Sequence, residues 1–163
     1  MSSSQVTNVV IAGLGGQGVL KASDILADVA FAAGLDVKKS EVHGMSQRGG
    51  SVASDVRFGE HVYSPMVPEG EADYLVVVSS DQVPVNRHLL KTSGTLLEPA
   101  QFNFDELRNK KSVNVALLGA LSRHLEFSAE AWIEAIRRNF PETLLQPNLD
   151  AFRLGSRAES SPE

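Results

Sequence analysis

The first forty residues alternate between strand-like and helix-like segments, which restricts the possible folds. Residues 6–12 form a short apolar run rich in β-branched side chains, glycines follow, and residues 19–33 then carry apolar side chains at helical spacing. Gly34 stands where a helix commonly ends, and residues 35–42 are typical of a second strand. This order makes a βαβ unit, so we expect its two strands to pair in parallel.

Later segments continue the alternation of strands and helices. Residues 51–58 alternate in polarity, a turn follows at Gly59, and residues 61–63 resume an extended chain, which predicts a β-hairpin. The continuous apolar run at 74–79 predicts a strand covered on both faces. Helical patterns cover 113–125 and the stretch from Ser128 to Pro141. We therefore expect one α/β domain over residues 1–155, with three layers, a mostly parallel sheet, helices on both faces and an inserted hairpin, followed by a disordered tail at 156–163.

Composition excludes several classes of function. Fifteen basic residues against 20 acidic ones give a net charge of -5, which argues against binding to nucleic acid or anionic lipid. The chain has no cysteine, which excludes thiolate catalysis, cysteine-ligated zinc and cysteine-held iron–sulfur clusters. The N-terminal residues lack a basic targeting region, and no apolar run reaches the ~20 residues of a membrane span. We expect a soluble, cytoplasmic protein without a nucleic-acid or membrane partner.

The first candidate site is a glycine-rich loop between the first strand and helix. Its spacing matches G-x-G-x-x-G, in which backbone N–H groups and a helix N-terminus can hold a pyrophosphate. The acidic residue expected to follow would be Glu41. Two other interpretations stay open: a tight turn that lets the helix pack closely on the sheet, and contact with a ligand held mainly by a partner chain. The candidate residues are Gly13, Gly15, Gly16, Gln17 and Gly18.

The second candidate site is a polar segment that follows the second strand. In a parallel sheet this segment emerges at the carboxyl edge, beside the glycine loop, where ligands of α/β proteins usually bind. Arg48 can pair with a carboxylate or phosphate, and the paired glycines can form an anion-accepting nest. The plainer interpretation is a polar loop that leads into the hairpin. The candidate residues are His43, Met45, Ser46, Gln47, Arg48, Gly49 and Gly50.

Patterns typical of other enzymes are missing. The four histidines show no metal-binding spacing, and the chain contains neither a Gly-x-Ser-x-Gly elbow nor a P-loop. We therefore predict no metal site and no catalytic residue in this chain.

Two longer runs carry a resemblance to a known family. Residues 9–19 (Val-Val-Ile-Ala-Gly-Leu-Gly-Gly-Gln-Gly-Val) and 41–52 (Glu-Val-His-Gly-Met-Ser-Gln-Arg-Gly-Gly-Ser-Val) resemble the gamma domain of 2-oxoacid:ferredoxin oxidoreductases. Within that family the chain looks most like the beta subunit of the indolepyruvate-specific enzymes, and residues 114–122 and 148–155 extend the likeness. One departure is the stretch 100–113, whose 14 residues are fewer than the family usually carries before the helix that follows.

The resemblance implies a subunit of an enzyme that decarboxylates a 2-oxoacid, such as indolepyruvate or another arylpyruvate, with coenzyme A as co-substrate. Electrons then pass to ferredoxin. Thiamine diphosphate, Mg²⁺ and the iron–sulfur clusters would sit in a large partner subunit, and the loops at 15–18 and 46–50 would face that partner. The chain alone would be inactive. The alternatives are a free-standing dinucleotide-binding protein and a module that associates with itself through the hairpin at 51–63.

Overall fold

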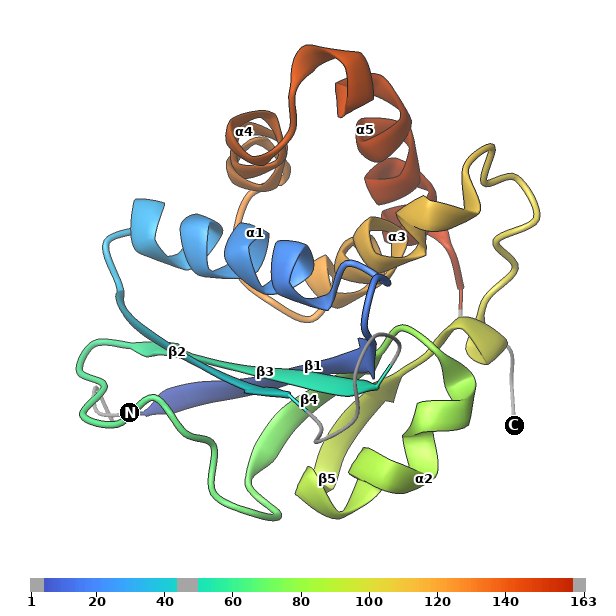
Figure 1. The fold of residues 1–163 in the computed structure, drawn as a ribbon. Coiled ribbons are helices and arrows are strands. Elements are labelled where there is room, and N and C mark those ends of the chain that lie inside the picture. Colours follow the sequence, from blue (N-terminus) through green and yellow to red (C-terminus); the bar gives the residue numbers. More distant parts are fainter. Residues whose placement is uncertain (1–4, 44–49, 160–163) are drawn as a thin grey trace.

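A five-stranded sheet forms the centre of the molecule (Figure 1). In the computed structural model, which describes residues 5–43 and 50–159, the strands lie in the order β2-β3-β1-β4-β5. β1 pairs in parallel with β4, and β4 with β5, whereas β3 is antiparallel to both β1 and β2. The strands are β1 (Val6–Leu14), β2 (Asp36–His43), β3 (Ser51–Gly59), β4 (Ala72–Val77) and β5 (Leu90–Leu97). The α/β class is confirmed, and β3 alone opposes the common strand direction.

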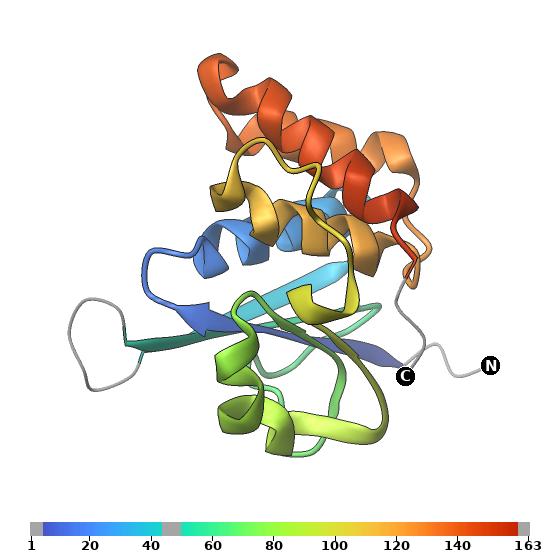
Figure 2. The same cartoon turned by 90° about the vertical axis from the view of Figure 1, so that its right-hand side faces the viewer.

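Helices cover the sheet unequally. α1 and α3 lie directly on one face, and α4 and α5 stack outside them, whereas the short α2 lies beyond the other face, near β5 (Figures 1 and 2). The helices are α1 (Val19–Ala32), α2 (Val83–Asn86), α3 (Val113–Ser122), α4 (Ala129–Asn139) and α5 (Glu142–Arg157). None of the helices in the described parts of the chain combines the length and apolar character needed to cross a membrane.

Two apolar clusters hold these layers together. The larger cluster fills the space between the sheet and the four stacked helices and includes the fully buried Ile11, Leu118 and Trp132. The smaller cluster lies on the other face and joins Val10 and Leu75 to neighbouring apolar side chains. Because the middle of β1 and the second half of β4 are covered on both faces, residues 9–12 and 74–77 are continuous apolar runs. The predicted central strand at 74–79 is confirmed by β4.

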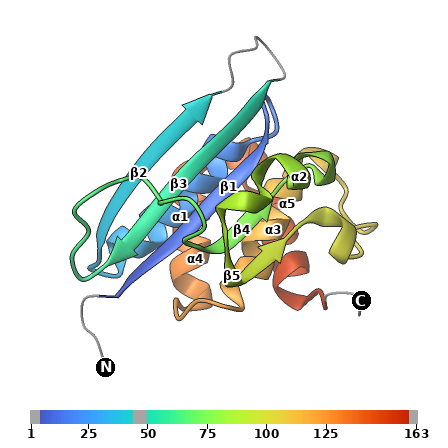
Figure 3. The ribbon, with the colours of Figure 1, turned by 90° about the horizontal axis from the view of Figure 1, so that it is seen from below.

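The expected parallel pairing between the first two strands is wrong. β2 runs in the same direction as β1, but β3 lies between them (Figure 3). β3 pairs along the whole length of β1, from Val6 opposite Gly59 to Leu14 opposite Ser51. The strand–helix–strand pattern correctly gives the direction of β2, but it does not reveal that a later strand takes the place beside β1.

The predicted hairpin at 51–63 is also wrong. Residues 61–63 form no strand, and the partner of β3 in the hairpin is β2. The chain after β3 is instead held by carboxylates of the sheet: Asp55 Oδ2 accepts from the Val67 N–H at 2.9 Å, and Asp36 Oδ2 accepts from the Val62 N–H at 2.9 Å. Burial raises the pKa of Asp55, against the opposing effect of the Val67 N–H. Both edges of β3 are paired, so this strand offers no edge for self-association.

In the helical C-terminal half, α3 and α4 follow their sequence signals, whereas α5 does not. Ser128 caps α4, because its Oγ accepts from the Ala131 N–H at 3.1 Å, as predicted. α5 was not predicted: it continues through Pro147 and ends at Arg157, two residues inside the stretch expected to be a tail. Residues 160–163 of that expected tail lie outside the described residues.

Candidate functional site

The glycine loop forms a closed turn between β1 and α1. Gln17 Oε1 accepts from the Leu14 N–H at 2.7 Å, so this side chain completes the turn. Gly16 and Gly18 have φ angles of 87° and 79°, which side-chain-bearing residues rarely adopt. A Cβ at Gly13 would lie 2.9 Å from Gln17 Oε1. The loop therefore depends on glycine both for its backbone conformation and for its close packing.

Three hydrogen bonds join this loop and its surroundings at one edge of the sheet. The Gly15 N–H donates to the Gly50 carbonyl at 2.9 Å, which brings the two predicted loops together. Asn114 Nδ2, at the start of α3, donates to the Gly18 carbonyl at 3.0 Å. Ser51 Oγ and Gln82 Oε1 are 2.8 Å apart, which ties the start of β3 to the turn after β4. The carboxyl ends of β1 and β4 thus meet the starts of β3 and α3.

The second candidate segment is only partly placed by the structure. For His43 the backbone is described, and it pairs with Val52 at the end of β2. Gly50 is tied to the glycine loop as given above. The remaining candidates lie outside the described residues: Met45, Ser46, Gln47, Arg48 and Gly49. Both ends of the segment therefore border the predicted edge, and the roles of its central residues stay predictions.

Asn114 is a site residue that the sequence reasoning did not single out. Only 5% of it is exposed, and its Oδ1 has no hydrogen-bond partner among the described residues. Beside it, a Cβ at Gly18 would overlap the Asn114 amide. The available signal was a single polar side chain within the apolar run 113–121.

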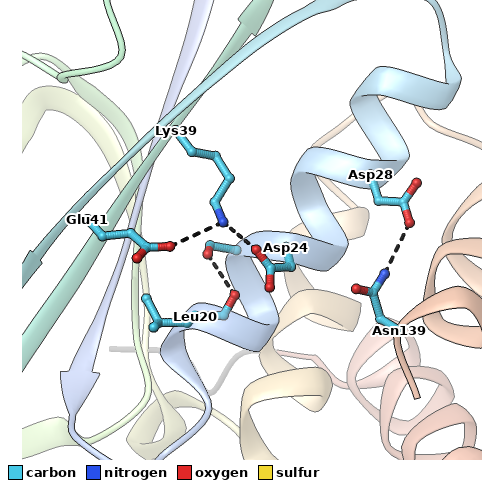
Figure 4. A network of polar contacts seen from close by, with 7 residues as sticks. Leu20, Asp24, Asp28, Lys39, Glu41 and Asn139 are labelled. Carbon is cyan, nitrogen blue, oxygen red and sulfur yellow. Dashed lines mark hydrogen bonds and ion pairs between the residues drawn. The ribbon is translucent and has the colours of Figure 1, made fainter. Parts of the chain in front are cut away.

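Glu41 does not occupy the place that a dinucleotide site needs. Its Oε1 is 3.4 Å from Lys39 Nζ, which also contacts Asp24 of α1 (Figure 4). The ribose-binding acid of a dinucleotide fold ends the strand beside the first strand. Here β3 separates β2 from β1, which sets Glu41 about 10 Å from β1 at two strand spacings. This geometry disfavours the dinucleotide interpretation.

We predict that NAD and FAD leave the thermal stability of the chain unchanged. A true dinucleotide site would stabilise the fold by about 2.7 kcal/mol at a hundredfold excess over its dissociation constant. A thermal-shift titration with both nucleotides, with AMP as the control, measures this difference. A saturable increase in Tm with NAD or FAD but not with AMP would show that the chain holds a dinucleotide site after all.

Other features of the described chain lie away from this edge. A groove at the amino ends of β1 and β4 is lined in part by Tyr74 and His124. Burial raises the pKa of Tyr74 and lowers that of His124. Within residues 5–43 and 50–159, no three His, Asp or Glu side chains gather in a way that could hold a metal ion.

Comparison with known proteins identifies the family. A sequence model of the pyruvate ferredoxin/flavodoxin oxidoreductase family matches residues 8–105 and 98–158. The chain belongs to this family. The resemblance carried by the two loops is therefore confirmed.

Its similarity to family members extends over nearly the whole chain. Subunit IorB of indolepyruvate oxidoreductase from Thermococcus kodakarensis is 37% identical over 193 aligned positions, which cover 93% of this chain and 95% of the relative. The gamma subunit of a keto/oxoacid ferredoxin oxidoreductase from Geobacter sulfurreducens has the same fold, with a TM-score of 0.75 at 20% identity over 93% of this chain and 95% of that one. The 2-oxoglutarate:ferredoxin oxidoreductase of Magnetococcus marinus matches with a TM-score of 0.79 at 22% identity over 94% of this chain but 31% of that longer one.

Proposed function

We propose that this chain is the gamma-type subunit of a 2-oxoacid:ferredoxin oxidoreductase that acts on indolepyruvate or another arylpyruvate. Its place as a subunit of an oxidoreductase of this kind follows from its family; the substrate class is the proposal. The observation that carries the substrate class is the 37% identity to an indolepyruvate oxidoreductase subunit over nearly the full length of both chains.

The chemistry of the complex is assigned to the partner chain. In the proposed reaction the bond between the oxo carbon and the carboxylate breaks, carbon dioxide leaves, the acyl group joins coenzyme A, and the released electrons pass to ferredoxin. This chain has no cysteine to ligate a cluster. We therefore assign thiamine diphosphate, Mg²⁺ and the iron–sulfur clusters to a large partner subunit, which also passes the electrons to ferredoxin.

This chain contributes a shaped surface rather than a reacting group. The side chains that hold the loop edge together are the amides of Gln17, Gln82 and Asn114 and the hydroxyl of Ser51, none of which ionises near neutral pH. The hydrogen bonds of Gln17 and Asn114 hold the glycine loop in one conformation, and that between Ser51 and Gln82 holds the start of β3 beside it. We propose that this edge, continued by the segment 43–50, faces the partner subunit near the substrate and coenzyme A.

The proposal is tested by anaerobic reconstitution of the chain with its large subunit. We expect no turnover from either chain alone, and ferredoxin reduction by the complex that requires coenzyme A. The kcat/KM for indolepyruvate should exceed that for pyruvate or 2-oxoglutarate by at least about tenfold, because an aryl side chain fills an apolar pocket that smaller substrates leave empty. Equal or better use of pyruvate or 2-oxoglutarate would contradict the substrate class, and full turnover without this chain would contradict its role.

We predict that Arg48→Ala spares the fold and impairs the complex. From the sequence, Arg48 is the one cation in the predicted partner-facing segment between His43 and Gly50. Loss of a charged contact at an interface should weaken assembly or turnover by about tenfold or more. The matched control is Arg137→Ala, which removes an exposed arginine of α4 that pairs with Glu134. Unfolding of the isolated Arg48→Ala chain, seen by circular dichroism, would show instead that Arg48 is structural.

A further inference from the structure

A groove on the helical side of the molecule lies far from the glycine loop in sequence and is not used by it. One wall is the segment 106–109, which follows β5, and the other is the outer side of α5; the two run side by side in Figure 2. The groove encloses about 440 Å³. We infer that it docks an acidic, amphipathic segment of the large partner subunit, an inference that rests on the proposed function.

The floor of the groove is apolar. It includes Leu107, Ala151 and Leu154, of which Leu107 and Ala151 are buried with 7% and 1% of their surface exposed. Leu154 packs against the main core from its edge. Because Leu107 and Ala151 are already covered, the apolar surface still open to a partner is that of the half-buried Leu154 and the exposed Pro147, which suits one apolar side chain of a partner segment.

The rim of the groove is basic on a chain that is acidic as a whole. The lining contains three arginines and two acidic residues, which leaves one net positive charge: Arg108, Arg153 and Arg157, with Glu106 and Asp150. Only Arg153 has an acidic partner within the described residues, Asp150 at 3.9 Å. Arg108 and Arg157 make no ion pair with any residue of 5–43 or 50–159, so both are available to carboxylates from another chain.

The position of the groove gives a reason for a protein occupant. It borders the stretch 100–113, where this chain is short. The family match divides into two parts that meet at residues 98–105, and the alignment with the Thermococcus relative spans 193 positions, more than the 163 residues of this chain. The relative therefore carries polypeptide that this chain lacks. A segment of the large subunit seated in the groove would cover Leu154 and Pro147, which the shorter chain leaves open.

The test compares two charge reversals of equal size in the full-length chain. Arg108→Glu with Arg157→Glu alters the groove, and Arg87→Glu with Arg137→Glu makes the same change of net charge at exposed positions elsewhere. Binding to the co-produced large subunit is measured by biolayer interferometry at two salt concentrations. We expect the groove variant to bind about tenfold more weakly and to lose part of the salt dependence, because two interfacial ion pairs become repulsive. The control should stay within about twofold of wild type, the range typical of surface substitutions.

The outcomes separate the inference from the proposed function. Binding of the wild-type chain together with equal affinities of both variants would overturn the groove while leaving the proposed function in place. Failure of the wild-type chain to bind the large subunit would contradict the proposed function itself. A photo-crosslinking residue at Gln146, which also lines the groove, supplies a second readout. A crosslink to an acidic segment of the large subunit supports the inference, and a crosslink to a second copy of this chain overturns it.

Discussion

Replacement of Gly155 by alanine should destabilise the folded chain by about 4 kcal/mol, since helix backbones cannot move apart without opening the core between them. A Cβ at Gly155 would overlap the backbone carbonyl of Ala116, and a Cβ at Gly119 would overlap that of Phe152. These two glycines therefore let α3 and α5 approach each other closely. The expected fall in Tm is roughly 12 °C for a domain of this size.

Thermal unfolding of the purified chain, followed by circular dichroism, measures this loss. The control is Ser156→Ala, one residue along α5, where the Oγ only donates to the Arg153 carbonyl of its own helix. We expect that control to change the free energy of unfolding by less than about 0.5 kcal/mol. A Gly155→Ala chain that melts like the control would mean that α3 and α5 are not in close contact.

Replacement of Gly18 by alanine should cost about 3 kcal/mol and disturb the candidate site directly. Alanine at a φ of 79° is strained, and its Cβ would also displace the buried Asn114 amide that donates to the Gly18 carbonyl. The link between the glycine loop and the start of α3 would be lost. Assembly with the large subunit should weaken together with stability, because the loop edge is proposed to face that subunit.

Gly16→Ala is the matched control for the glycine loop. Gly16 has a similar φ of 87°, but a Cβ there would meet nothing within 4 Å. Only the backbone strain remains, which we expect to cost about 1 kcal/mol. Denaturant unfolding of the two variants therefore isolates the contribution of the contact with Asn114. Equal losses would show that this contact contributes nothing beyond the strain.

Local sequence signals predicted where helices and strands lie along the chain better than they predicted which strands pair with one another. The apolar run at 74–79, the helix from Val113 and the cap at Ser128 are set by nearby residues, and all three are confirmed. Pairing of β3 between β1 and β2 is a long-range choice that no local pattern records. The sequence did not indicate α5, because a proline such as Pro147 removes a backbone hydrogen bond inside a helix and is usually found at a helix end. Its burial of Leu149 and Phe152 against the core compensates for the missing N–H.

The sequence predicted which loops meet at the candidate site, but it did not predict the side-chain contacts within the site. The spacing of the glycines placed the first loop at the carboxyl end of β1, and the bond between Gly15 and Gly50 confirms that the second segment returns to it. Gln17 was expected to face a ligand or partner, yet its Oε1 closes the turn by accepting from Leu14. The role of Asn114 depends on a contact across 96 residues of sequence, which only the folded chain reveals.

The most direct test of the family role is recovery of the tagged chain from its own cells under anaerobic conditions, with the bound proteins identified by mass spectrometry. The proposed role predicts a large, cysteine-rich subunit bound to the chain, which carries thiamine diphosphate and iron–sulfur clusters and reduces ferredoxin with a 2-oxoacid and coenzyme A. Recovery of the chain alone, or only with copies of itself, would contradict its role as a subunit of such an oxidoreductase.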